Sequence, residues 1–292
     1  MASISSAWAL YAKLVLSTAS THSIATETGR WNNHILKHFD PDCEIESITS
    51  MNLLEFRSSL IGKKLSPQSI SHCLSLFRRV LQRAKQWKLI SGELPSFDMP
   101  RFDNKRIRFL TKEEANELLL CVSLKSSLWH DICVLALHTG LRSGELFKLR
   151  PCHFDSQNSA LHVLDTKSNS NRTVPLNKQA LEVLSRNISR KELIFTEHGK
   201  QILYAGRTFR QAVEICRLNS HTQDRRQRVV FHTLRHTFAS WLVQSGIPLA
   251  VVGQLLGHKS MQMTMRYAHL APAQGVSAVK ALEQFTNSVN LE

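Results

Sequence analysis

Six side chains suited to phosphoryl transfer lie in the second half of the sequence, at the ends of expected helices and strands: Arg142, Lys167, His232, Arg235, His258 and Tyr267. Cleavage of a phosphodiester without a metal ion needs a nucleophile, donors that stabilise charge on the equatorial oxygens, and an acid for the leaving oxygen. A planar guanidinium donates paired hydrogen bonds to two phosphate oxygens and keeps its charge at any relevant pH. A tyrosine hydroxyl can serve as the nucleophile. The set therefore indicates phosphoryl transfer.

Each of these residues, taken alone, has an ordinary structural interpretation. A single tyrosine such as Tyr267 is more often a core or interface residue, and a single arginine more often makes a weak surface ion pair. His232 and His236 are spaced like two metal ligands on one helix, but there is no His-Glu-x-x-His pattern and no third ligand is evident. The sequence also has no Gly-x-x-x-x-Gly-Lys-Ser/Thr phosphate loop. We therefore expect no metal site and no cofactor.

The composition is that of a folded protein with a polyanionic partner. The 292 residues, 42% of them hydrophobic, suffice for two ordinary domains. The 37 Lys and Arg against 23 Asp and Glu give a net charge of +14, which favours nucleic acid, although charge alone fits a merely basic protein equally well. The six cysteines are scattered without a Cys-x-x-Cys pair. The sequence shows neither a signal peptide nor an apolar run of the roughly 20 residues that span a bilayer. We expect a cytoplasmic protein without a membrane partner.

The first part of the chain, to about Ser91, has the apolar periodicity of short helices separated by polar loops. The clearest helix starts at Ser66-Pro67, a cap residue followed by proline at the first helical position. Its polar face carries Arg78, Arg79 and Arg83. These side chains are equally compatible with phosphate contacts and with an ordinary solvated face.

A break in the helical pattern separates two expected domains. Glycine and prolines interrupt the pattern after Ser91, and the basic residues Lys105 and Arg106 follow as further candidate DNA contacts. We expect a helical domain over residues 1–95, a linker over 96–106 and a larger domain over 107–292.

Local signals place helices in the larger domain. Thr111 begins a capping box, and an apolar helix over Leu128–His138 ends at Gly140, which suits a left-handed C-cap. Further helical segments are expected over residues 234–243, 249–256 and 261–267.

Four motifs in this larger domain resemble the signature of a known family. They are Thr-Gly-Leu-Arg142-Ser-Gly-Glu145-Leu, His232-Thr-Leu-Arg235-His236, Leu-Gly257-His258 and Tyr267. In order and spacing they resemble the tyrosine recombinases, the phage integrase family of site-specific integrases. The resemblance is strong from about Arg108 to Leu270 and looser before. It implies a mainly α fold: a small all-α, SAM-like core-binding domain and a larger, mainly helical (α+β) catalytic domain with a short β-sheet, forming a clamp around DNA.

The resemblance implies a role for the tyrosine, the two arginines and the two histidines of the set. Tyr267 would attack the scissile phosphate, giving a 3′-phosphotyrosyl intermediate that stores the bond energy for rejoining. Arg142 and Arg235 would hold the equatorial oxygens of the phosphate. His232 and His258 would lie beside the same phosphate, and which of them acts as the base stays open.

Two further residues complete the predicted site. Glu145, three residues after Arg142, resembles the acidic residue that braces the active-site arginine, and the spacing allows that contact. Lys167 lies between the alternating segments 160–164 and 172–176, an expected hairpin, and resembles the family lysine that protonates the leaving 5′-oxygen. Alternative assignments for this lysine are Lys178 and Lys200.

These features predict a site-specific recombinase, an integrase that cuts and rejoins double-stranded DNA to integrate or excise a mobile element or prophage. The resemblance implies a homotetramer that holds two duplexes and exchanges strands through a Holliday junction. Accessory DNA-bending or directionality proteins would be further partners. The alternatives are a recombinase that resolves chromosome dimers and a non-catalytic DNA-binding regulator on the same fold; a type IB topoisomerase shares the chemistry but would relax DNA as a monomer. The sequence leaves open whether an N-terminal arm-binding domain precedes the core-binding helices.

Overall fold

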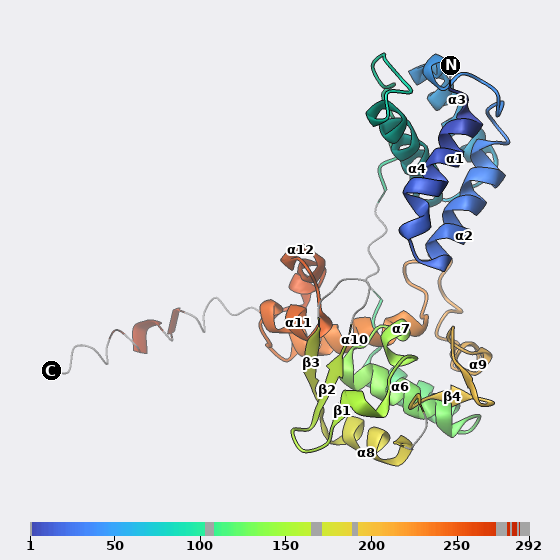
Figure 1. Cartoon of the computed structure of the whole chain (residues 1–292). Coiled ribbons are helices and arrows are strands. Elements are labelled where there is room, and N and C mark those ends of the chain that lie inside the picture. Colours follow the sequence, from blue (N-terminus) through green and yellow to red (C-terminus); the bar gives the residue numbers. More distant parts are fainter. Residues whose placement is uncertain are drawn as a thin grey trace. The chain divides into compact units, whose positions relative to one another are not determined.

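A computed structural model describes residues 2–102, 108–164, 171–188, 192–272, 279–280, 282–284 and 286. The chain divides into two compact units, Met1–Asn104 and Lys105–Glu292 (Figure 1). The first unit has one hydrophobic cluster and the second has two, among the described residues. In the part of the chain that the structure describes, no helix has both the length and the apolar character that a membrane crossing requires.

Helices build the first unit. They are α1 (Ile4–Leu14), α2 (Thr21–Arg30), α3 (Ser50–Gly62) and α4 (Pro67–Gln86), with 3₁₀ turns at Leu16–Thr18 and Ile45–Ser47 and a π-helical turn, Trp31–Ile35, that continues α2. Each α-helix starts after a Ser or Thr whose hydroxyl accepts a backbone N–H from the first turn. Aromatic rings fill the core. The ring centroid of Phe77 lies 5.9 Å from that of Trp31 and 6.3 Å from that of Phe56, and both contacts are edge-on.

Helix α4 begins as the sequence predicted, with the Ser66 hydroxyl as cap and Pro67 in the first turn. One face is buried in the core, and the other exposes the three predicted DNA contacts, Arg78, Arg79 and Arg83. They are not equivalent, because Arg79 binds side chains of other helices, including a carboxylate, whereas Arg83 donates to Gln86 of its own helix. Nη2 of Arg79 donates to Oε1 of Glu27 at 2.6 Å, and its Nε donates to the hydroxyl of Tyr11 at 3.3 Å.

Residues 91–102 contain no helix or strand, yet several of them are attached to the first unit. Glu46 accepts hydrogen bonds from the backbone N–H groups of Ser91 and Gly92 at 3.0 and 2.8 Å. Phe97 and Met99 pack against the core. The part of the predicted linker 96–106 that carries these two side chains therefore packs against the core of the first unit, and the two compact units divide between Asn104 and Lys105. The predicted DNA contacts Lys105 and Arg106 lie outside the described residues.

The second unit starts with a series of helices. These are α5 (Lys112–Ser123), α6 (Ser127–Thr139), α7 (Ser143–Leu146), a 3₁₀ turn (Pro151–His153), α8 (Lys178–Asn187) and α9 (Arg207–Ile215). The predicted capping box is present, because the Thr111 hydroxyl accepts the N–H of Glu114 at 3.1 Å and the Glu114 carboxylate accepts the N–H of Thr111 at 2.9 Å. Helix α6 is buried on most sides and forms the centre of the core.

A small antiparallel sheet covers one part of this core. Its strands, in the order β1-β2-β3, are β1 (Phe154–Asp155), β2 (Ala160–Val163) and β3 (Arg172–Pro175). Leu161 pairs with Val174 and Val163 pairs with Arg172, so the predicted hairpin is confirmed. Its connection, with Lys167, lies outside the described residues. A separate pair, β4 (Thr196–Glu197) and β5 (Lys200–Gln201), precedes α9.

The last part of the second unit carries a small cluster of its own. It consists of α10 (Phe231–Gln244), α11 (Leu249–Leu256), α12 (Met261–Thr264) and the 3₁₀ helix η5 (Met265–Leu270). The buried residues Ala239, Val243, Val252, Leu256 and Tyr267 hold these elements together. The bounds of α11 are those predicted, whereas the helix expected over 261–267 changes to a 3₁₀ helix after Thr264.

Candidate active site

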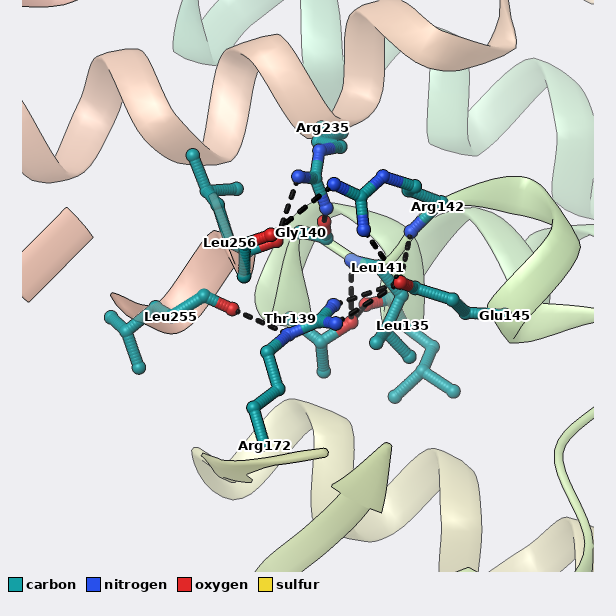
Figure 2. A network of polar contacts seen from close by, with 11 residues as sticks. Leu135, Thr139, Gly140, Leu141, Arg142, Glu145, Arg172, Arg235, Leu255 and Leu256 are labelled. Carbon is teal, nitrogen blue, oxygen red and sulfur yellow. Dashed lines mark hydrogen bonds and ion pairs between the residues drawn. The ribbon is translucent and has the colours of Figure 1, made fainter. Parts of the chain in front are cut away.

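A tight turn at the end of α6 positions the first candidate arginine. Gly140 has φ +63°, a left-handed conformation, and a Cβ there would lie 2.4 Å from Cδ1 of Phe238. Arg142 follows as the cap of α7. The carbonyl group of Gly140 accepts a hydrogen bond from Nη1 of Arg235 at 2.6 Å, so the turn brings both candidate arginines into one site (Figure 2).

The C-terminal end of α11 offers three successive carbonyl groups, and each accepts a hydrogen bond from a different arginine. Figure 2 shows two of them, those of Leu255 and Leu256. Leu255 accepts from Nε of Arg172 at 3.0 Å, Leu256 from Nη2 of Arg235 at 2.8 Å, and Gly257 from Nη2 of Arg142 at 3.3 Å. The last carbonyls of a helix have no partner within the helix and lie at the negative end of its dipole. They are therefore good acceptors for cations.

Glu145 pairs with two of these three arginines. Its Oε1 accepts from Nη1 of Arg142 at 2.8 Å and from Nη1 of Arg172 at 3.0 Å, and its Oε2 accepts from Nη2 of Arg172 at 2.8 Å. The expected contact between Glu145 and Arg142 is thus present. Burial alone would raise the pKa of Glu145, but the hydrogen bonds and charge of Arg172, followed by the hydrogen bonds from Arg142, outweigh burial and lower the pKa. The carboxylate is therefore charged at neutral pH.

The two candidate arginines differ in exposure. The Arg142 side chain is 34% exposed, whereas Arg235 is only 4% exposed. Burial, and then the charge of Arg142, lowers the pKa of Arg235 to about 9, which leaves this guanidinium protonated at neutral pH. Its two hydrogen bonds to carbonyl groups use two of the five N–H donors of a guanidinium.

Tyr267 lies on η5, and its hydroxyl contacts a histidine of α10. The hydroxyl oxygen is 2.6 Å from Nδ1 of His236, and the tyrosine is 5% exposed. Burial raises the pKa of Tyr267, and the charges of Arg266 and Arg235 offset this only in part. The phenol is therefore protonated at neutral pH, so a reaction at its oxygen needs a proton acceptor.

The two predicted histidines have different surroundings. Nδ1 of His258 lies 2.8 Å from the hydroxyl oxygen of Thr264. Burial, and then the charge of Arg235 and its neighbouring arginines, lowers the pKa of His258 to about 4, so this ring is neutral at pH 7. His232 is exposed on α10, and its ring stands at 88° to that of His236 with the centroids 4.8 Å apart.

The structure thus brings together most of the predicted set that it describes. The side chains of Arg142, Arg235 and Glu145 share one hydrogen-bonded network, and the charge of Arg235 acts on both Tyr267 and His258. Lys167 lies outside the described residues. The alternative lysines, Lys178 and Lys200, are exposed at the starts of α8 and β5. Within the described ranges, no three His, Cys, Asp or Glu side chains are arranged to hold a metal ion.

Two residues of the site were missed by reasoning from the sequence, Arg172 and His236. Alternation along β3 places Arg172 on the same face as Val174, which is buried, and a charged residue on a core-facing side needs a partner. That signal was present in the sequence. For His236 the sequence offered only its place next to Arg235, and the contact with Tyr267 joins two elements far apart in the chain.

Comparison with known proteins identifies the family. The profile of the phage integrase family matches residues 108–274. The chain belongs to this family, and the predicted family is confirmed. The integrase of Salmonella phage P22 is 34% identical over 211 residues, which are 68% of this chain and 53% of that protein. The chain thus spans about half the length of the P22 integrase. A tyrosine recombinase of Thermosipho africanus is 29% identical over 248 residues, 82% of this chain and 86% of the relative.

Solved structures of integrases share the fold. The Tn1549 transposon integrase in complex with transposon right end DNA matches with a TM-score of 0.78 at 20% identity, covering 98% of this chain and 100% of that chain. A λ integrase tetramer bound to a Holliday junction matches with a TM-score of 0.73 at 20% identity, covering 94% of this chain and 78% of that chain. The predicted mainly α fold with a short sheet is therefore confirmed.

Proposed function

We propose that this protein is a site-specific DNA recombinase that cleaves a DNA strand with Tyr267 while Arg142 and Arg235 hold the scissile phosphate. The observation that supports this most strongly is the convergence of the two arginines on the adjacent carbonyl groups of Leu256 and Gly257, with Arg235 close enough to Tyr267 to affect its pKa. Two guanidinium groups and a phenol in one site supply the donors and the nucleophile that phosphodiester cleavage requires.

The charge of the site favours a phosphodiester. The guanidinium groups of Arg142 and Arg172 contact one carboxylate, that of Glu145. Together with Arg235 they also contact the C-terminal end of α11, which is worth about −0.5 charge. A net positive site attracts the single negative charge of a phosphodiester. The pentavalent transition state concentrates more charge on its oxygens, so prearranged donors stabilise it more than the ground state.

In the proposed cleavage step the Tyr267 oxygen attacks phosphorus, and the bond to the 5′-oxygen breaks. The phenolic proton passes to a histidine, for which His236 and His258 are the two candidates: the first contacts the hydroxyl, and the second is neutral at pH 7. His232 would donate to a non-bridging oxygen of the phosphate, and Lys167 would protonate the departing 5′-oxygen. Because the phosphotyrosyl bond conserves the energy for rejoining, the reaction needs no ATP, and because side chains fill every role it needs no metal ion.

We further propose that the enzyme works as a homotetramer on two DNA duplexes and integrates or excises a mobile element. The name of the phage P22 relative, integrase, and the λ integrase tetramer on a Holliday junction support this assignment. The unpaired state of all six cysteines is compatible with the reducing cytoplasm as the site of action.

The test is covalent capture on a nicked DNA substrate. Duplex DNA from the ends of the genetic element that encodes the protein is nicked next to the cleavage point, so that the short 5′-hydroxyl fragment diffuses away and the phosphotyrosyl complex accumulates. Tyr267→Phe is compared with Tyr204→Phe, a matched control because Tyr204 lies in the same unit and is 75% exposed. We expect a covalent band on a denaturing gel for the native protein and for the control, and none for Tyr267→Phe. Specific DNA binding without a band for any of the three proteins would contradict the proposal and favour a regulator.

A further inference from the structure

We propose that Arg172 is a positioning residue of this site: it holds Glu145 and the end of α11 together, and thereby sets where Arg142 and Arg235 lie. The inference rests on the proposed function, because its consequences are measured on DNA cleavage. It extends that function to a residue outside the predicted set.

The contacts of Arg172 join three elements of the second unit. From β3 its Nη1 and Nη2 reach the two oxygens of Glu145 in α7, at 3.0 and 2.8 Å, and its Nε reaches the carbonyl group of Leu255 in α11, at 3.0 Å. All three guanidinium nitrogens are therefore bound to acceptors of the protein. The side chain is 9% exposed. Arg172 is thus arranged to act on other residues rather than on a substrate.

The acceptors of Arg172, which are Glu145 and the end of α11, also contact the two arginines proposed to bind phosphate. Oε1 of Glu145 is shared between Arg172 and Arg142. The next two carbonyl groups after Leu255 hold Arg235 and Arg142. A carboxylate with both oxygens fixed by one guanidinium cannot rotate away from the second. Loss of Arg172 would therefore loosen Arg142 from two sides and shift the acceptor of Arg235.

The backbone at Gly257 is adapted to the same side chain. Gly257 has φ +66°, and a Cβ at this position would lie 2.9 Å from both Cδ and Nη1 of Arg172. The end of α11 therefore approaches Arg172 more closely than any residue with a side chain allows. Since the bonds of Arg172 hold its guanidinium in place, the arginine has little room to give way. This close approach fixes the distance between β3 and the carbonyl groups that hold the other two arginines.

The chemistry of the contact requires arginine at position 172. A lysine ammonium is a point charge and cannot bind both oxygens of a carboxylate in one plane while also reaching a carbonyl group from its stem. Arg172→Lys therefore keeps the charge of the site and removes its geometry. The fold offers a matched control in Arg186, which binds the buried carboxylate of Asp131 through Nη2 and, at 3.0 Å, through Nε. No contact of Arg186 in the described structure involves the candidate site.

The test compares the rate of covalent capture with the affinity for DNA. Displacement of a catalytic group by about 1 Å costs on the order of 10²-fold in rate, so we expect Arg172→Lys to lower the cleavage rate at saturating DNA by about that factor. The dissociation constant should change much less, because contacts along the whole backbone dominate affinity. Arg186→Lys should leave both unchanged. A residue needed only for folding would instead lower the fraction of active protein while the remaining molecules cleaved at the native rate.

A double-mutant cycle and a second perturbation complete the test. If Arg172 acts through Glu145, adding Arg172→Lys to Glu145→Gln should slow cleavage little beyond the slower single variant. The inference would be overturned if the loss of rate in the double variant equalled the product of the losses in the two single variants. It would also be overturned if Arg172→Lys cleaved at the native rate at saturating DNA. Gly257→Ala displaces Arg172 without changing any charge, so it should reproduce the loss of rate even if Arg172→Lys folds poorly. A native protein that forms no covalent complex would refute the proposed function and this inference with it, whereas native cleavage with unaffected variants would refute the inference alone.

Discussion

Replacing Gly140 with alanine should destabilise the second unit and disturb the arginine site together. At φ +63° an L-residue is disfavoured by about 1–2 kcal/mol. The new Cβ would also lie 2.4 Å from Cδ1 of Phe238 and 3.0 Å from Cδ2 of Leu256, and such overpacking costs about 1–3 kcal/mol. The sum is a loss of about 2–5 kcal/mol in the free energy of unfolding, or a fall of roughly 4–20 °C in Tm for a unit of this size.

Two other glycines separate the contributions to this loss. Gly199 also has a positive φ, +72°, but has nothing within 4 Å of its Cβ position, so Gly199→Ala should cost only the conformational part, about 1–2 kcal/mol. Gly144, in α7, has neither constraint, and Gly144→Ala should be neutral or stabilising by up to about 1 kcal/mol. Urea unfolding followed by circular dichroism measures all three variants. If Gly140→Ala loses no more stability than Gly199→Ala, the clash with Phe238 does not exist and the packing described for the turn is wrong.

Three further predictions concern charge and protonation. The pKa of His258 is about 4 in the folded protein and near 6.5 in the unfolded chain, so the unfolded state binds more protons between these two pH values and the free energy of unfolding rises with pH across that window. Urea unfolding at several pH values should therefore show a flatter rise for His258→Asn than for the native protein. An equal slope for the two proteins would contradict the argument that burial lowers this pKa. Because burial raises the pKa of Tyr267, Tyr267→Phe should remove an ionisation step that lies above the usual phenol value of about 10 in an ultraviolet absorbance titration. Loss of a step at or below that value instead would contradict the burial of the phenol. The salt dependence of DNA binding is measured as the slope of log affinity against log salt concentration. If Arg78 contacts phosphate, Arg78→Ala should reduce the steepness of this slope by about 1, whereas Arg79→Ala should change the slope less because Arg79 is bound to Glu27. Equal slopes for both variants and the native protein would exclude this face of α4 from contact with DNA.

The sequence was sufficient wherever the deciding contacts are local. The Thr111 capping box, the left-handed Gly140 and the bounds of α11 all depend on residues within one helical turn. Strand β1 could not be predicted, because its two residues are too few to show alternation and their pairing with β2 defines them. Residues 261–267 have one apolar pattern in the sequence, yet their helical geometry changes after Thr264, where packing rather than pattern decides.

The contacts of the candidate site also divide into local ones, which the sequence predicts, and long-range ones, which it does not. The i to i+3 spacing of Arg142 and Glu145 made their contact predictable. Arg172 meets Glu145 across 27 positions and Leu255 across 83, and Tyr267 meets His236 across 31. Such contacts depend on strand register and on how helices pack, and local periodicity contains neither. The family motifs identify Tyr267 and Arg142 as candidate site residues even though local patterns do not predict their long-range contacts. The motifs do not reveal which other side chains hold these two residues in place.

In the proposed site, the C-terminal end of α11 would contribute to phosphate binding through the arginines that it holds. Phosphate groups usually bind at helix N-termini, where backbone N–H groups donate to them directly. Here the helix presents carbonyl groups, and arginines bound to them reverse the sign of the surface that a ligand would meet. Each guanidinium has five donors, so one held by a carbonyl group can still donate to a phosphate, and it is already ordered before the ligand arrives. The arginine side chains then lose their conformational entropy when the protein folds and not when the ligand binds. On this reasoning, displacing the end of α11 should slow cleavage, because its carbonyl groups hold the two arginines proposed to bind phosphate.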